Sequence, residues 1–145
     1  MTLIAGGESS GGLTIRGHIL GKDGIFASAL IVEMLARTHQ RISQLRQRVY
    51  EITGRLYSLE ESIPSTPEMR VAVPRRLAQT PPDQLGSYRV VKVSHADGTK
   101  FYLDNDSWAL VRFSGTEPIL RLFVEADSPD KAAALIQHLR EFVTK

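Results

Sequence analysis

The C-terminal part of the chain contains four strand-like runs separated by short turns, and this pattern constrains the fold more than any other feature. The runs are Tyr88–Ser94, Thr99–Leu103, Ser107–Phe113 and Ile119–Ala126. Asp97-Gly98 lies between the first two and is a typical hairpin turn. Connections this short join antiparallel neighbours, because a parallel crossover needs a dozen or more residues. The sequence therefore predicts an antiparallel four-stranded sheet.

Helical patterns flank this predicted sheet. Ser128 is suited to cap, and Pro129 to open, a final helix whose apolar residues fall on one stripe. Another helix is predicted from Pro67 to Gln79, with Pro74 expected to kink or split it. Four antiparallel strands with covering helices make a small α+β domain.

The connection between the third and fourth runs has the composition of an anion-binding loop. Arg112 carries a planar, permanently charged fork that can bind two phosphate oxygens at once. Ser114 and Thr116 add hydroxyl donors, and Gly115 lets the backbone turn so that successive N–H groups converge on one oxyanion. Pro118 ends the loop by fixing its own φ. The alternative is a hairpin connection that carries an incidental arginine.

A second loop, residues 6–12, is rich in glycine and carries polar side chains. Glu8 can accept hydrogen bonds from neighbouring sugar hydroxyls, and Ser10 can donate or accept. We expect a strand before it, at Thr2–Ala5, and a strand or extended loop after it, at Leu13–Ile19. The alternative is that this glycine-rich segment is only a turn.

A long apolar segment follows. Residues 25–36 are apolar at nearly every position, which predicts a helix buried beneath other elements. Asp23 is expected to cap this helix, so Lys22 lies just before a helix N-terminus, where anions are attracted. The alternatives to a functional role are a solvated surface lysine at Lys22 and a partly buried, hydrogen-bonded imidazole at His18.

The middle of the chain contains the predicted boundary between two domains. Ser43 is expected to cap a shorter helix that Gly54 closes, and Arg55–Leu59 is a candidate edge strand. Glu60–Pro67 holds two prolines and two serines, a composition typical of a linker. We therefore predict a first domain at residues 1–62 and a second at residues 63–145.

Both loops resemble those of a known enzyme family. Residues 112–121 resemble the phosphate-binding loop of the α-D-phosphohexomutases, the phosphoglucomutase/phosphomannomutase family, with Phe113 where proline is common. Residues 7–12 resemble the sugar-binding motif of this family, and residues 18–24 its lysine segment. The resemblance implies the end of an α/β third domain followed by a C-terminal domain with a TATA-binding-protein-like fold.

The resemblance also implies roles for individual residues. It implies a catalytic role for Lys22, and a grip on the sugar hydroxyls by Glu8 and Ser10. Gly12 stands where glucosamine-phosphate mutases usually carry histidine, which favours glucose or mannose phosphates as substrates. The residues that the resemblance assigns to the substrate phosphate are Arg112, Ser114, Gly115 and Thr116.

The implied reaction interconverts hexose 1-phosphate and 6-phosphate through a phosphoserine, with Mg²⁺ as cofactor and glucose 1,6-bisphosphate as activator. The sequence contains neither the serine loop of the family nor its aspartate-rich magnesium loop, so it offers Mg²⁺ no ligands. The chain alone is expected to be inactive, with a phosphohexose and the missing N-terminal domains of the same enzyme as partners. A freestanding phosphosugar-binding module is the alternative.

Composition narrows the other function classes. The net charge of +2 gives little support for binding nucleic acid or an anionic membrane, although an arginine cluster at residues 37–48 leaves a nucleic-acid binder as a minor alternative. No apolar run reaches the roughly 18 residues of a membrane span. The absence of cysteine excludes disulfides and fits a cytoplasmic location. Because the first domain has few strands to cover its apolar helix, we expect it to pair with a second copy of the chain or to be loosely ordered.

Overall fold

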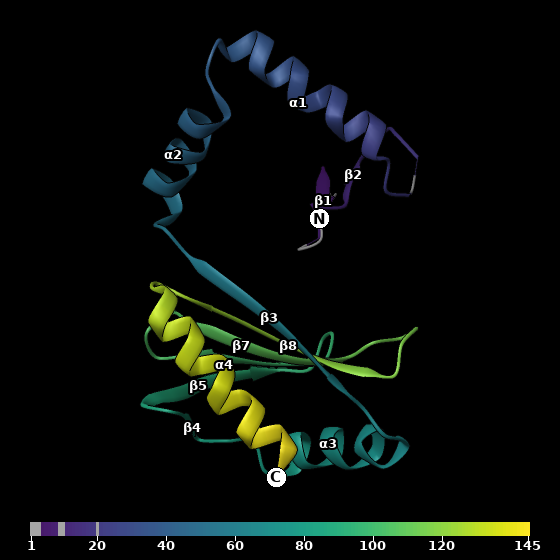
Figure 1. The fold of residues 1–145 in the computed structure, drawn as a ribbon, viewed down its shortest axis with the longest axis vertical. Helices are drawn as coiled ribbons and strands as arrows, with labels where there is room; N and C mark the ends of the chain where they lie inside the picture. The colour runs from purple at the N-terminus through teal and green to yellow at the C-terminus, as the bar shows by residue number, and fades with distance from the viewer. Residues whose placement is uncertain (1–3, 9–10, 20) are drawn as a thin grey trace. The chain divides into compact units, whose positions relative to one another are not determined.

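A computed structural model describes residues 4–8, 11–19 and 21–145, and it divides the chain into two compact units. The first unit is Met1–Ile52 and the second is Thr53–Lys145. The second unit contains a mixed arrangement of helices and an antiparallel sheet (Figure 1). The predicted α+β class is therefore confirmed.

The sheet of the second unit has six strands in the order β3-β8-β7-β6-β5-β4, and every neighbouring pair is antiparallel. The four predicted strands form its centre, and two further strands extend it at its edges. The strands are β3 (Tyr57–Pro64), β4 (Gln84–Leu85), β5 (Tyr88–Ser94), β6 (Thr99–Leu103), β7 (Trp108–Phe113) and β8 (Ile119–Ala126).

Two helices accompany this sheet, α3 (Pro67–Gln79) and α4 (Pro129–Thr144). Each begins with a hydroxyl cap, because Thr66 accepts a hydrogen bond from the Met69 N–H and Ser128 accepts one from the Lys131 N–H. Helix α3 runs through Pro74 as one helix, so it is not split there.

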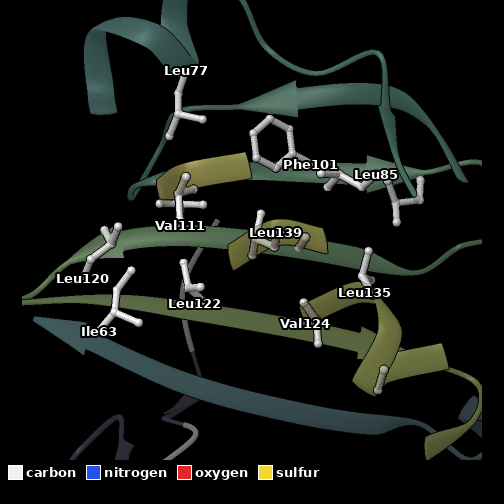
Figure 2. Close-up of a cluster of buried hydrophobic side chains, with 14 of the residues drawn as sticks. Ile63, Leu77, Leu85, Phe101, Val111, Leu120, Leu122, Val124, Leu135 and Leu139 are labelled. Atoms are coloured by element: carbon white, nitrogen blue, oxygen red, sulfur yellow. The ribbon is translucent and has the colours of Figure 1, made fainter. Parts of the chain in front are cut away.

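One hydrophobic core joins these elements. Burial alternates along β8, where every second side chain is buried, as expected for a strand covered on one face. Figure 2 shows side chains from both helices and from the strands gathered in one cluster. The fully buried large side chains are Leu77, Phe101, Leu120, Leu122, Val124, Leu135 and Leu139.

The predicted linker Glu60–Pro67 is wrong. Strand β3 covers most of it and pairs with β8 without interruption, from Tyr57 opposite Ala126 to Pro64 opposite Ile119. Ile63 of β3 is buried in the core. The prolines misled the prediction, because proline is tolerated at the end of an edge strand. In the sequence, the boundary between the two units follows Ile52, whereas the predicted domains were residues 1–62 and 63–145.

The described residues of the first unit form two short strands and two helices. Strands β1 (Ala5–Gly7) and β2 (Leu13–Ile15) pair antiparallel. Strand β2 is shorter than the predicted Leu13–Ile19, and β1 extends into the predicted loop at Gly6 and Gly7; Thr2 and Leu3 lie outside the described residues. The helices are α1 (Gly24–Thr38) and α2 (Ile42–Thr53). The helix at residues 25–36 is confirmed, but none of its residues is buried, so the prediction of a buried helix is wrong for this chain.

The caps of these two helices differ from each other. Asp23 caps α1 as predicted, because its Oδ1 accepts hydrogen bonds from the N–H groups of Ile25 and Phe26, each 3.0 Å long. Ser43 does not cap α2, which already begins at Ile42. Beyond its end, Gly54 has a φ of +74°, as expected where a helix terminates.

Candidate functional site

The loop predicted to bind phosphate joins β7 to β8 and is shaped by its own hydrogen bonds. The Ser114 N–H donates to the Ile119 carbonyl over 3.0 Å, which closes the loop at its base. The Oγ of Ser114 accepts from the N–H groups of Thr116 and Glu117, over 3.4 and 3.2 Å. A hydroxyl that accepts from the following amides stabilises a tight turn and keeps its own proton available to a ligand.

Three further donors of the loop are unengaged within the part of the chain that the structure describes. No hydrogen bond there uses the Gly115 N–H, the Thr116 hydroxyl or the Nη atoms of Arg112. One short loop therefore carries Arg112, Ser114, Gly115 and Thr116, and several of its donors have no acceptor among the described residues. Such a group of donors has the composition of an oxyanion site.

The sequence suggested that Gly115 is needed for the backbone to turn, but the structure gives it a different role. Its backbone is not in the left-handed region, so the turn itself does not require glycine. A Cβ added at Gly115 would enter open space, with no atom within 4 Å. The missing side chain therefore leaves room beside a free N–H group.

Arg112 lies at the end of β7 and is oriented by a neighbouring turn. Its Nε lies 3.0 Å from Oδ1 of Asp97, in the turn between β5 and β6. Gly98 has a φ of +78°, and a Cβ there would overlap the Val111 carbonyl oxygen. Glycine is thus required for this turn to reach β7, and the contact through Nε leaves both terminal nitrogens of Arg112 for a ligand.

Two arginines that the sequence did not single out as site residues support the loop from outside. Arg70 of α3 donates from Nη2 to the carbonyls of Ser114 and Glu117, over 3.1 and 2.7 Å. Arg121 of β8 pairs with the Glu117 carboxylate over 2.9 Å and with Glu60 over 3.3 Å. No local signal marks Arg70, because it lies far from the loop in sequence.

The glycine-rich loop of the first unit brings two predicted site residues together. Lys22 donates from Nζ to Oε2 of Glu8 over 2.8 Å, with both side chains more than half exposed. Gly12 makes room for this pair, because a Cβ there would overlap the Lys22 side chain. The third predicted residue of this loop, Ser10, lies outside the described residues.

The segment on both sides of Lys22 has a structural role. His18 bonds through Nε2 to Oδ2 of Asp23 over 2.9 Å, and its ring stacks on Phe26 with the ring centroids 3.9 Å apart. The hydrogen bond from the Phe26 N–H, followed by that of His18, lowers the pKa of Asp23 below its usual value. Asp23 therefore remains charged as the α1 cap, and His18 forms a hydrogen bond, as expected if its role is structural.

The described residues do not form a metal site. No three or more His, Cys, Asp or Glu side chains gather there in a way that could hold an ion. These residues do not fit Mg²⁺, and no step through a metal follows from them. Within the same part of the chain, no helix has the length and apolar character needed to cross a membrane.

Comparison with known proteins identifies two domains of one family. Residues 68–142 match the family described as phosphoglucomutase/phosphomannomutase, C-terminal domain, and residues 2–52 match alpha/beta/alpha domain III of the same family. The first match covers the loop at residues 112–118, and the second covers Glu8 and Lys22.

Individual relatives agree with this match. The chain is 33% identical over 91% of its length to a phosphoglucomutase/phosphomannomutase of Thermococcus kodakarensis, and 36% identical over 97% to a protein of Pyrococcus furiosus assigned as a phosphoglucosamine mutase. It covers 26% and 29% of these relatives, so it spans less than a third of their length.

A solved structure supports the fold. A protein of Thermus thermophilus assigned as a phosphomannomutase superposes with a TM-score of 0.70 and 27% identity, over 98% of this chain and 27% of that one. The fold, both domain matches and the relatives agree. The chain belongs to the phosphoglucomutase/phosphomannomutase family, and it matches the C-terminal domain and domain III of that family.

Proposed function

We propose that this chain is the substrate-binding C-terminal part of a phosphohexomutase, which interconverts hexose 1-phosphate and 6-phosphate through a phosphoserine and a bisphosphate intermediate. The observation that carries the proposal is the group of unengaged donors at Arg112, Gly115 and Thr116, beside open space on a loop stiffened by Ser114. The relatives are mutases of phosphosugars, which fits a phosphate ligand.

The loop acts by holding the phosphate that is not being transferred. The fork of Arg112 takes two of its oxygens, and the Gly115 N–H and the two hydroxyls take the others. When this end of the substrate is fixed, the reacting hydroxyl is held in one orientation, which lowers the entropic cost of the reaction. Because the donors are already in place, little reorganisation is needed when the phosphate arrives.

The glycine-rich loop acts on the sugar. Glu8 accepts hydrogen bonds from ring hydroxyls with the help of Ser10, while Lys22 turns from Glu8 toward a phosphate oxygen when substrate is bound. We propose glucose or mannose phosphates as substrates, because glucosamine-phosphate mutases usually carry histidine where this chain has Gly12. A histidine here would displace the Lys22 side chain that packs at this position. The names of the relatives also include phosphoglucosamine mutase, so hexosamine phosphates belong in the test.

The phosphoserine and the magnesium ligands belong to other domains of the complete protein in this proposal. Mg²⁺ would there offset charge on the transferring phosphoryl group, and glucose 1,6-bisphosphate would act as activator. The chain alone therefore binds phosphosugar without turnover. A cytoplasmic location stays a prediction.

Kinetics of a protein that joins this chain to the upstream domains would test the division of labour between the two loops. Arg112→Ala should raise KM for hexose phosphates about thirtyfold, or about 2 kcal/mol, the low end for loss of a charged partner because the side chain is half exposed. Arg89→Ala removes the same charge from an exposed position on β5 and should leave KM unchanged.

The sugar loop is tested in the same protein. Glu8→Ala should change the ratio of kcat/KM among glucose, mannose and glucosamine phosphates, because it removes a contact to hydroxyls. Glu51→Ala, an exposed carboxylate of α2, is the control. Unchanged kinetics of both Arg112→Ala and Glu8→Ala across all these sugars would contradict the proposed site.

A further inference from the structure

The loop at residues 114–118 rests on the segment that leads from β3 into α3. The Ser65 N–H donates to the Pro118 carbonyl over 2.9 Å. Arg70, in the first turns of α3, donates to the Ser114 and Glu117 carbonyls. Three loop carbonyls are therefore held by this one segment, two of them by a single guanidinium.

The bond to Ser114 has a direct effect on Gly115. The Ser114 carbonyl and the Gly115 N–H belong to the same planar trans peptide unit, in which C=O and N–H point in opposite directions. When Arg70 holds the carbonyl, it also fixes the direction of the Gly115 N–H, which points away from Arg70. That N–H has no acceptor among the described residues and borders open space.

Arg70 is itself held in place. Its guanidinium lies 5.3 Å from the centre of the Phe113 ring, at the last position of β7. Its backbone N–H donates to the Thr66 carbonyl over 3.2 Å, within the capped start of α3. Nη2 donates to both carbonyls while the planar guanidinium lies over the ring, whereas a lysine ammonium has donors but no flat face to stack.

We propose that Arg70 is a positioning residue for phosphate binding: it holds the Ser114 and Glu117 carbonyls so that the Gly115 N–H is presented to the anion before the anion arrives. This inference rests on the proposed phosphate-binding role of the loop. Arg70 does not touch the phosphate. Its charge behind the loop also cancels the repulsion that two free carbonyl oxygens would exert on an anion.

The test uses the 145-residue chain with inorganic phosphate as the probe, followed by the amide resonances of the loop. Arg70→Met should weaken phosphate binding about fivefold to tenfold, as expected when two hydrogen bonds from a charged donor are lost. It should also lower the ¹H–¹⁵N heteronuclear NOE of Gly115 in the free protein. Arg70→Lys keeps the charge and should show a smaller loss with a similar drop in the NOE.

Two control variants separate charge from position. Arg75→Met removes an exposed charge from the same helix and should alter neither affinity nor the Gly115 NOE. Arg112→Ala should weaken phosphate binding while the NOE of Gly115 stays high. Because Arg70→Lys keeps a cation at this position, it tests the inference even if Arg70→Met does not fold.

The outcomes distinguish this inference from the proposed function. If Arg112→Ala weakens binding but the Arg70 variants leave both affinity and the Gly115 NOE unchanged, the positioning role is wrong and the phosphate site stands. If the unmodified chain gives no shift at Gly115 with phosphate, the phosphate site itself is wrong, and the role of Arg70 falls with it.

Discussion

Gly115 is a position in this loop at which the fold does not require glycine. Its torsion angles suit any residue, and a methyl group there would meet no protein atom. Gly98, in the neighbouring turn, is the opposite case: its φ is +78° and a Cβ would overlap the Val111 carbonyl oxygen. One glycine leaves space for a ligand, and the other is required by the backbone.

Alanine at these two positions should therefore have contrasting effects. Gly115→Ala should change the free energy of unfolding by less than about 0.5 kcal/mol, as is usual for a surface change, yet weaken phosphate binding, because the methyl group occupies the space beside the free N–H. Gly98→Ala should cost at least about 1–2 kcal/mol through its left-handed backbone. Urea unfolding and phosphate titration measure the two quantities. Unchanged phosphate affinity of Gly115→Ala would show that the ligand does not approach there.

The residues of the proposed site stand out in the sequence, but the residues that support them do not. Arg112, Ser114, Gly115 and Thr116 stand together in the chain, so their donors are visible as a local pattern. The contacts of Arg70 with the loop and of Asp97 with Arg112 depend on strand order and on how α3 joins β3. No periodicity or spacing encodes such contacts between distant residues.

At the scale of elements, only the start of β3 was visible in the sequence: the candidate edge strand was Arg55–Leu59, whereas the observed strand is Tyr57–Pro64. Of its two aliphatic residues, Leu59 is exposed and Ile63 is buried, so its alternation is weak. It nevertheless pairs with the whole of β8 and leads into the segment that carries Ser65 and Arg70. The clearer strands, β5 to β8, have either stronger alternation or distinct turn residues, and they were predicted to within one residue.

Removal of β3 should therefore destabilise the second unit. A fragment of residues 53–145 should unfold at a higher urea concentration than one of residues 67–145, with a difference of at least about 2 kcal/mol, because the shorter fragment loses buried Ile63 and exposes the edge of β8. Equal midpoints for the two fragments would show that β3 is dispensable and would favour the linker that the sequence suggested.

At the scale of the whole molecule, the two units differ in how completely they bury their apolar surface. The second has a continuous core, whereas none of the described residues of the first is buried. Helix α1 exposes several large apolar side chains, which are Ile25, Ile31, Val32 and Met34. Apolar area left in water costs about 25 cal/mol per Å², so such a surface normally finds a partner.

Hydrogen exchange at several protein concentrations tests this imbalance. Amides of α1 should exchange fast in dilute chain, and any protection should rise with concentration as a second copy covers the helix. Amides of β6, β7 and β8 should stay protected at every concentration, since they lie in a complete core and serve as the internal control. Strong protection of α1 in a proven monomer would reveal a core in the first unit that these residues do not show.

The most direct test of the proposed phosphate-binding site is a titration of the chain with three ligands, followed residue by residue through its amide resonances. Inorganic phosphate and glucose 1-phosphate should both shift the amides of Gly115 and Thr116, and glucose at the same concentration should leave them unchanged. Glucose 1-phosphate should in addition shift the loop around Glu8, because we propose that this loop contacts the sugar. If neither phosphate ligand shifts Gly115 and Thr116, or if both shift only residues elsewhere in the chain, the loop between β7 and β8 is not the phosphate site.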